Sequence, residues 1–331
     1  MVNLTREGLK EPEWKEISVR LPQFNLIEMV RRTKEAPVWV HIAPSNLFIG
    51  EIAPIQQALL ESGIVQEGII GLETWDEEIV DRIYRPHDNL RLRIVMPPGR
   101  ANQPEVIAST AETVFADTSR PEEWEKSREY FAKPSLQMVT ITCTEKGYSI
   151  RDPNDRLAET ISKDIQNGPS KPGHIMAKLA SLLNHRHQNG AGPIALVSMD
   201  NCSENGKRLF EAVSFIAQEW VSRKLVEKEF LEYLESKKVS FPWTMIDRIT
   251  PSPAKENKEW LEERGIQNME ILRTVRGTFA APFVNTEHIS YLVIEENFPN
   301  GRPPLEKVDT SGNRIIFVES SGIVDKCEKM K

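Results

Sequence analysis

Four turns of this sequence place small or polar residues directly after an apolar segment, where they could bind a ligand or react. The first reads Ala43-Pro44-Ser45-Asn46, the second begins at Glu73, the third spans Thr144–Tyr148 and the fourth spans Asp200–Gly206. In open α/β sheets, ligands bind beyond the carboxyl ends of the strands. We therefore expect these turns to meet at one edge of a sheet and to form the functional site.

The first turn separates an apolar strand pattern from a helix pattern, as in the first unit of a nucleotide-binding domain. Glycines usually let the backbone approach the phosphates there, while the helix N-terminus offers N–H donors. Here Ala43 and Ser45 are small substitutes, and Ser45 or Asn46 could cap the helix or donate to a phosphate. We predict a cofactor site at these residues and the adjoining Leu47 and Phe48. An ordinary strand-to-helix turn remains the alternative.

Glu73 ends the next predicted strand. A carboxylate there can accept hydrogen bonds from the hydroxyls of an adenosine ribose, and it repels a 2′-phosphate, which favours NAD over NADP. A surface carboxylate is the alternative reading. We also place Thr144, at the start of the third turn, in the predicted cofactor site.

Asp200 and Asn201 end a buried strand. A carboxamide in that place can donate to a carbonyl oxygen that gains negative charge during a reaction. An Asx turn is the alternative, and spacing alone cannot separate the two.

Other reactive residue types carry weaker signals. His185 and His187 near a helix end have no third ligand candidate nearby, so we predict no metal site. Cys202 lies beside Asn201, but no base is identifiable for it, which favours an unreactive thiol.

A βαβ unit must position the first two turns. Residues 38–43 predict a strand, residues 52–63 an amphipathic helix that ends at Gly63, and residues 67–73 a second strand. Strands apolar throughout, alternating with helices, predict an α/β fold with a Rossmann-type, doubly wound sheet. Further strands are expected at 89–96, 105–109, 136–148 and 193–201, and helices at 173–190 and 206–234.

Changes in local composition along the sequence also predict a division of the chain into domains. Residues 1–36 are expected to form a helical lead-in and residues 37–285 the dinucleotide-binding domain. Prolines and a glycine cluster after Thr286. We expect residues 286–331 to begin a mostly helical second domain and to be too few for an independent core.

Composition narrows the class of protein. The chain has 331 residues, 39% of them apolar, and a formal net charge of -7. General nucleic-acid binding needs a basic footprint, which this balance disfavours. Apolar runs are short, no membrane span is expected, and no secretory signal is visible. Three scattered cysteines without a CxxC motif indicate reduced thiols and a cytoplasmic protein.

Five stretches together resemble the polyol-specific long-chain dehydrogenases, the mannitol dehydrogenase family. They are VWVHIAPSNLFIG, VTITCTEKGY, VSMDNCSENG, FPWTMIDRITP and LVIEENFPNGRPPLE, which occur in the family's order. The forms PVWVH…NLF and ENFPNGRPPLE are most similar to the branch of fructuronate reductases, also called D-mannonate oxidoreductases.

This resemblance implies a Rossmann-type domain followed by a mostly helical domain, with the active site between them. It implies metal-free, NAD(H)-dependent interconversion of a secondary alcohol and a ketone on an open-chain sugar acid or polyol. Lys331 matches the family's general acid/base and Asn201 one of two asparagines that steady the carbonyl oxygen. Glu145 matches an acidic residue near the proton path, and Asp247 a polar residue between the domains.

The sequence departs from the family pattern at two places. Glycines usually stand at the positions of Ala43 and Ser45, and an arginine at that of Ile49. The family's second asparagine and its histidine would lie beyond Lys331. We therefore expect either a second polypeptide to complete the helical domain or the chain to be a truncated product. The alternatives to a sugar-acid enzyme are a mannitol-type polyol 2-dehydrogenase and an inactive nucleotide-binding remnant.

Overall fold

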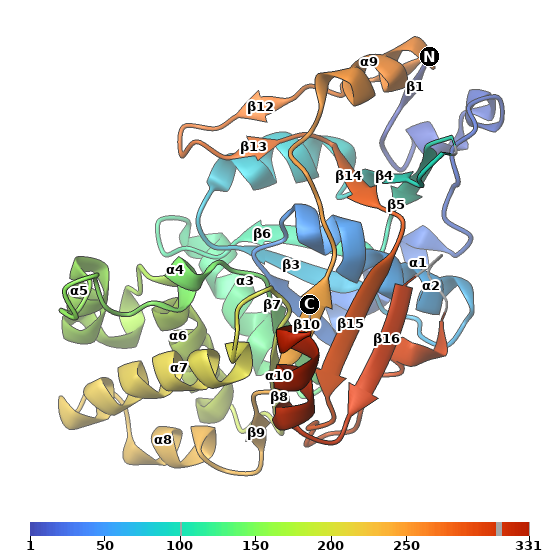
Figure 1. Ribbon diagram of the computed structural model, residues 1–331. Helices are drawn as coiled ribbons and strands as arrows, with labels where there is room; N and C mark the ends of the chain where they lie inside the picture. The colour runs from blue at the N-terminus through green and yellow to red at the C-terminus, as the bar shows by residue number, and fades with distance from the viewer. Residues whose placement is uncertain (100, 309–312, 331) are drawn as a thin grey trace.

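A parallel sheet of six strands forms the centre of the protein (Figure 1). The computed structural model describes residues 1–99, 101–308 and 313–330. Across the sheet the strands are β6 (Thr110–Phe115), β3 (Ile69–Glu73), β2 (Trp39–Ile42), β7 (Met138–Ile141), β8 (Ile194–Ser198) and β9 (Val239–Ser240). Each neighbouring pair is parallel. The strand order reverses between β2 and β7, which confirms the predicted Rossmann-type, doubly wound sheet.

Both faces of this sheet are covered, which explains why most residues of its strands are apolar and buried. Side chains alternate between the faces, so that Val40 packs into one core and Trp39 into the other. The first core is closed by α1 (Leu26–Glu35), α3 (Pro121–Ala132), α5 (Glu159–Asn167), α6 (Ile175–Gln188), α7 (Asn205–Ser222) and α8 (Lys228–Leu234).

The second core lies between the main sheet and a smaller, three-stranded sheet. It contains the π-helical turn η3 (Phe48–Ile52), which continues into α2 (Ala53–Glu61), and the turn η4 (Ile79–Tyr84). The smaller sheet has the order β10 (Thr244–Asp247), β15 (Ser290–Glu295) and β16 (Asn313–Val318). β10 and β15 are antiparallel, whereas β15 and β16 are parallel.

A third apolar cluster joins the N-terminal segment to segments from later in the chain. β14 (Phe283–Glu287) runs parallel to β4 (Arg91–Met96), which pairs with β5 (Gln103–Ile107). The remaining pairs are β1 (Val2–Asn3) with β11 (Ile266–Gln267), and β12 (Leu272–Arg273) with β13 (Phe279–Ala280). Other helical segments are α9 (Lys255–Glu263), η1 (Gly8–Lys10), η2 (Pro12–Lys15), η5 (Arg85–His87), η6 (Gly168–Ser170) and η7 (Leu305–Lys307).

Most expected elements are present, and two are corrected. The strands expected at 89–96 and 105–109 are present as β4 and β5, which pair in antiparallel orientation. The strand expected at 136–148 is wrong in its second half, because β7 ends at Ile141 and Glu145–Tyr148 forms the short helix α4. The single helix expected at 206–234 breaks into α7 and α8 near Lys224, whose φ of 59° cannot continue a right-handed helix.

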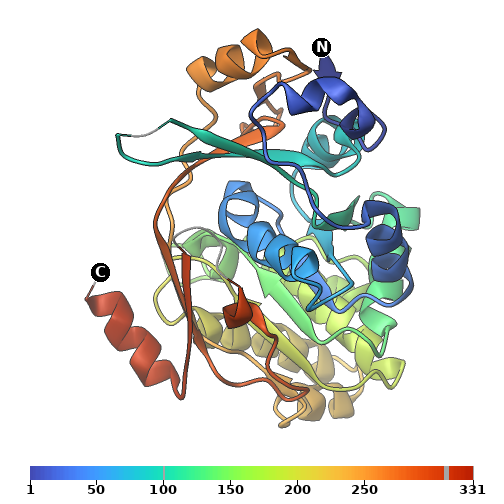
Figure 2. The ribbon, with the colours of Figure 1, turned by 90° about the vertical axis from the view of Figure 1, so that its right-hand side faces the viewer.

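The last helix, α10 (Ser321–Lys329), packs against β10 and β15 and buries Val324. Figure 2 shows it at one side of the molecule, away from the main sheet. The predicted boundary at residue 286 falls near the end of β14, but β10 from before it pairs with β15 from after it. The division into 1–36, 37–285 and 286–331 therefore stays a prediction. No helix of the described residues has the length and apolar character to cross a membrane.

Candidate functional site

The four turns singled out from the sequence follow four adjacent strands. β3, β2, β7 and β8 are neighbours and run in the same direction, so their carboxyl ends lie at one edge of the sheet. The fold thus brings the turns after Ile42, Glu73, Ile141 and Ser198 to the same edge. The order of strands reverses at its middle, between β2 and β7, where doubly wound folds bind ligands.

The turn after β2 follows a glycine-like path without glycine. Ala43 has a φ of 61°, in the left-handed region that side chains disfavour. Two hydrogen bonds hold it there: the Ser45 N–H donates to the Ala43 carbonyl at 2.7 Å, and so does the Thr142 hydroxyl at 2.8 Å. Tyr84 donates its hydroxyl to the Pro44 carbonyl at 2.8 Å. These contacts fix the backbone of the turn, and its assignment as a phosphate-binding turn stays a prediction.

The helix that follows begins at Asn46, and the N–H groups of its first turn have no partner within the helix. Ser45 is exposed beside them, while Asn46 and Leu47 are half-buried. The Phe48 ring is fully buried and stacks on the His41 ring, with 4.3 Å between centroids. Phe48 could reach a ligand only through its backbone.

Glu73 lies at the end of β3 and is buried. Its Oε1 accepts hydrogen bonds from the N–H groups of Thr74, Trp75 and Asp76 at 2.9, 2.7 and 3.1 Å. Burial raises the pKa of its carboxyl group, and the three N–H donors oppose that rise. The side chain thus shapes the turn that follows β3.

Lys178, a residue that the sequence analysis did not predict, binds two of the turns at this edge of the sheet. Its ammonium group is buried and donates at 2.5 Å to the Thr74 carbonyl and at 2.5 Å to the Asp117 carboxylate. Burial lowers the pKa of Lys178, whereas Asp117 raises it. The turns after β3 and β6 are therefore joined. A lysine within the apolar run MAKLASLL is the signal that could have found it.

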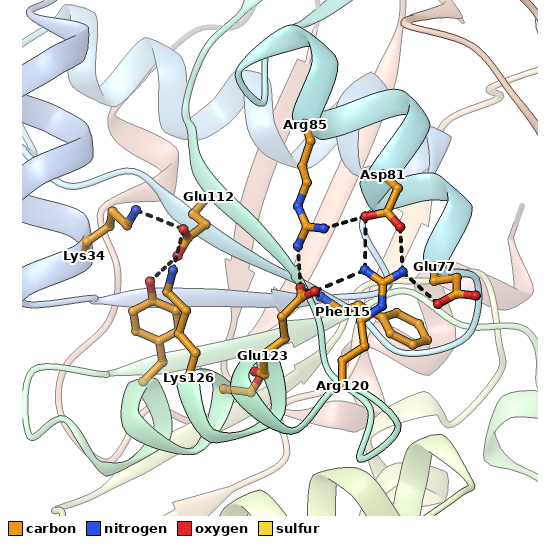
Figure 3. Close-up of polar contacts among 11 residues, drawn as sticks. Lys34, Glu77, Asp81, Arg85, Glu112, Phe115, Arg120, Glu123 and Lys126 are labelled. Atoms are coloured by element: carbon orange, nitrogen blue, oxygen red, sulfur yellow. Dashed lines mark hydrogen bonds and ion pairs between the residues drawn. The ribbon is translucent and has the colours of Figure 1, made fainter.

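A second charged network braces the same region (Figure 3). The Arg120 guanidinium binds Asp81 at 2.5 and 3.0 Å, Glu77 at 2.7 Å and Glu123 at 3.1 Å. Arg85 bridges Asp81 and Glu123 from the other side. The Arg120 guanidinium lowers the pKa of Asp81. Together these contacts tie the residues after β6 to η4.

The turns after β7 and β8 are joined through Asp200. The Tyr148 hydroxyl donates to its carboxylate, and the Cys202 N–H donates to it at 3.1 Å. Burial raises the pKa of Asp200 and raises that of the Cys202 thiol to about 12, so this thiol is a poor nucleophile near neutral pH.

The candidate polar residues on these two turns face solvent. Thr144 and Glu145 follow β7, Asn201 follows β8, and all three are exposed. They are therefore available to a ligand at this edge.

Asn205 connects the β8 turn to the smaller sheet. Its side-chain oxygen accepts from the Thr244 N–H at 3.1 Å, and its amide donates to the Thr244 carbonyl at 3.1 Å. Thr244 begins β10, and Asp247 ends it opposite Tyr291 of β15. The predicted interdomain residue Asp247 is thereby held in a strand anchored to the candidate site.

Lys331 lies outside the described residues, but the end of α10 is placed. Lys329 binds Asp325 at 2.6 Å, and this contact raises the pKa of Lys329, with a smaller contribution from Glu204. Glu204 belongs to the turn that also carries Asn201. α10 itself packs on β10, whose Thr244 is bound to Asn205 of the β8 turn. Within the described residues, no group of three His, Cys, Asp or Glu side chains could hold a metal ion.

Comparison with known proteins assigns the fold to a family. The family model of the mannitol dehydrogenase Rossmann domain matches residues 100–307. D-mannonate oxidoreductase from Thermotoga maritima is 45% identical over 331 residues, which are 100% of this chain and 60% of that protein. Mannitol 2-dehydrogenase from Aspergillus fumigatus is 28% identical over 321 residues, 95% of this chain and 57% of that protein.

A solved structure has the same fold. The mannitol 2-dehydrogenase of Pseudomonas fluorescens, a ternary complex with NAD and D-mannitol, superimposes with a TM-score of 0.78 at 24% identity, over 99% of this chain and 60% of that chain. This chain thus spans about 60% of the length of the relatives that it matches. It belongs to the mannitol dehydrogenase family, because the family model covers more than half of its residues.

Proposed function

We propose that this protein is an NAD(H)-dependent oxidoreductase that interconverts a secondary alcohol and a ketone on an open-chain sugar acid of the D-mannonate/D-fructuronate type. One observation carries the choice of substrate. The chain is 45% identical to a D-mannonate oxidoreductase along its whole length but 28% identical to a mannitol 2-dehydrogenase.

The residues at the sheet edge fit a dinucleotide. The left-handed Ala43 keeps the backbone path of a glycine turn, and Ser45 with the first N–H groups of the helix would hold the pyrophosphate. Glu73 ends the neighbouring strand, in the place where an acid accepts from the adenosine ribose. The nicotinamide, when bound, supplies or accepts the hydride.

The protein's own residues would handle the proton and the developing charge. In this proposal Lys331 transfers the proton, Asn201 donates to the substrate oxygen, and Glu145 and Asp247 line the proton path and the substrate cleft. The packing of α10 on β10, whose Thr244 is bound to Asn205 of the β8 turn, supports the assignment of Lys331 and Asn201 to one site. The exposure of Asn201 and Glu145 at the sheet edge supports contact with substrate.

We further propose that residues corresponding to the remaining length of the relatives complete the substrate site. They would belong to a longer form of this chain or to a second polypeptide. Exposed apolar side chains near α10 and the smaller sheet support this, because such a surface usually packs against another part of a protein. They are Ile249, Ile289, Tyr291, Ile316 and Ile323.

An assay with two substrates tests the proposal. The 331-residue chain, alone and together with the product of the adjoining downstream sequence, is mixed with NADH and either D-fructuronate or D-fructose. We expect NADH oxidation with fructuronate, and a loss of 10²–10³-fold in kcat for Asn201→Ala, since a donor to the reacting oxygen is removed. Faster turnover of fructose would favour the mannitol-type alternative. NADH binding without turnover of either substrate, in both preparations, would favour the inactive remnant.

A further inference from the structure

The tip of the β12–β13 hairpin docks on the turn that follows β3. The Thr274 hydroxyl donates to the Asp76 carboxylate at 2.6 Å, and the Val275 N–H donates to Glu78 at 2.7 Å. The Thr278 N–H closes the tip by donating to the Thr274 hydroxyl at 3.0 Å. Two segments about 200 residues apart in sequence are thereby held together beside Glu73.

This docking places an arginine over an exposed tryptophan. The Arg276 guanidinium lies 4.2 Å from the centroid of the Trp75 ring, and the Trp75 side chain is 62% exposed. Tryptophan is usually largely buried, so a solvent-facing indole requires an explanation. The turn carrying it is rigid, because Glu73 accepts from the Trp75 N–H and Lys178 donates to the Thr74 carbonyl.

We propose that Trp75 and Arg276 form the binding platform for the adenine ring of the dinucleotide. This inference rests on the proposed cofactor site. The adenine is bonded to the ribose that Glu73 would contact, so it must lie close to the Glu73 carboxylate. Trp75 is two residues beyond Glu73, and the backbone N–H of Trp75 donates directly to the Glu73 carboxylate.

The chemistry of the pair suits an uncharged purine. Aromatic rings and guanidinium planes both stack on nucleobases, and stacking needs no formal charge on the ligand. The neighbouring acids are already engaged: Asp76 with Thr274, Glu78 with Arg82, and Asp117 with Lys178. Because these acids already have partners, the Trp75–Arg276 pair is the feature of this turn that a flat ligand would contact.

The chain contains a matched control for this pair. On α9 the Arg264 guanidinium lies 3.8 Å from the centroid of the Trp260 ring. That stack packs against the third apolar cluster, which contains the N-terminal segment. Variants of Trp260 and Arg264 thus remove the same interaction without touching the turn after β3.

Binding measurements by calorimetry test the platform with three probes: NADH, ADP-ribose and the reduced nicotinamide mononucleotide. We expect Trp75→Ala to weaken NADH and ADP-ribose about tenfold or more, because one stacked base is lost. Binding of the mononucleotide, which lacks adenine, stays unchanged. Trp75→Phe retains most of the affinity, Arg276→Ala loses several-fold, and Arg264→Ala and Trp260→Phe lose none.

Two results would overturn the platform, and they are distinguishable. If the wild-type chain binds NADH and ADP-ribose and Trp75→Ala binds them equally well, the platform is wrong and the cofactor site stands. If the wild-type chain binds none of the probes at millimolar concentration, the cofactor proposal fails and the platform fails with it. Tryptophan emission supplies a second readout, since ADP-ribose should quench the wild type more than Trp75→Phe.

Discussion

Glu51 and Arg248 form a buried ion pair in which the Glu51 Oε2 and the Arg248 Nε are 2.7 Å apart. The Ser290 hydroxyl also donates to Glu51, and Arg248 donates to the Glu287 carbonyl. Glu51 belongs to η3, at the start of the helix beside the candidate phosphate-binding turn, and Arg248 follows Asp247. The pair thus connects the proposed cofactor site to the smaller sheet.

Removing one member of this pair should be costly. We expect Arg248→Met to lower the free energy of unfolding by about 3–5 kcal/mol, because it leaves the Glu51 carboxylate buried without its cation. The double variant Glu51→Leu/Arg248→Met should recover much of that loss. Urea denaturation followed by circular dichroism measures both. Equal instability of the single and double variants would show that the charges are not coupled in this way.

Ala43→Gly should improve the turn after β2. The left-handed conformation costs an L-residue roughly 1–2 kcal/mol, and glycine adopts it freely but loses up to about 1 kcal/mol more chain entropy on folding. We therefore expect stability to rise by up to about 1 kcal/mol and NADH affinity to increase. Ala58→Gly, in the middle of α2, is the control and should destabilise by about 1 kcal/mol. A destabilised Ala43→Gly protein would refute the strain.

The charge of Glu73 can be separated from its role in the turn. Glu73→Gln keeps a carbonyl oxygen for the three N–H donors but removes the negative charge. We expect it to fold normally and to discriminate less against NADPH, because a 2′-phosphate is no longer repelled. Glu73→Ala removes the acceptor too and should also weaken NADH and lose about 1–3 kcal/mol of stability. Affinities of both cofactors for both variants decide the assignment. Unchanged discrimination in both would show that the ribose contact is misassigned.

His41 predicts a pH dependence of stability. Burial lowers its pKa from 6.5 to about 3. Between these values the unfolded chain binds the proton and the folded protein does not, so stability falls as the pH decreases through this window. The contribution reaches about 1.4 kcal/mol per pH unit and disappears above about pH 7. Unfolding free energies of the wild type and His41→Gln, measured from pH 7.5 to pH 4.5, should diverge in slope. Parallel curves would contradict the buried, neutral imidazole.

Local patterns predicted the parts of the fold that depend on neighbours in sequence. Three of the four residues of Trp39–Ile42 are apolar because both sheet faces are covered, so the run could be read directly as a strand. The short helix Glu145–Tyr148 was missed because it is stabilised by a contact distant in sequence: the Tyr148 hydroxyl donates to Asp200, on the turn after the neighbouring strand β8.

In the candidate site, too, features set by local sequence were predicted and contacts between distant residues were not. The four turns were found because carboxyl ends of parallel strands must share an edge. The partners of those turns were not, since Arg276 meets Trp75 and Arg248 meets Glu51 only through tertiary folding. The left-handed Ala43 could have been expected, because it stands where a glycine is usual.

The pairing of β1 with β11 has a consequence for how the protein is made. Val2 lies opposite Ile266, so β1 cannot take its final place until β11, some 260 residues further along the chain, has been synthesised. β4 likewise awaits its neighbour β14. Contacts so remote along the polypeptide slow folding, since the loop between them must close first. Until those segments are made, Leu4 and Trp14 lack the side chains of Leu261, Ile266 and Phe283 that share their apolar cluster in the folded protein, and such incompletely packed intermediates are prone to aggregate.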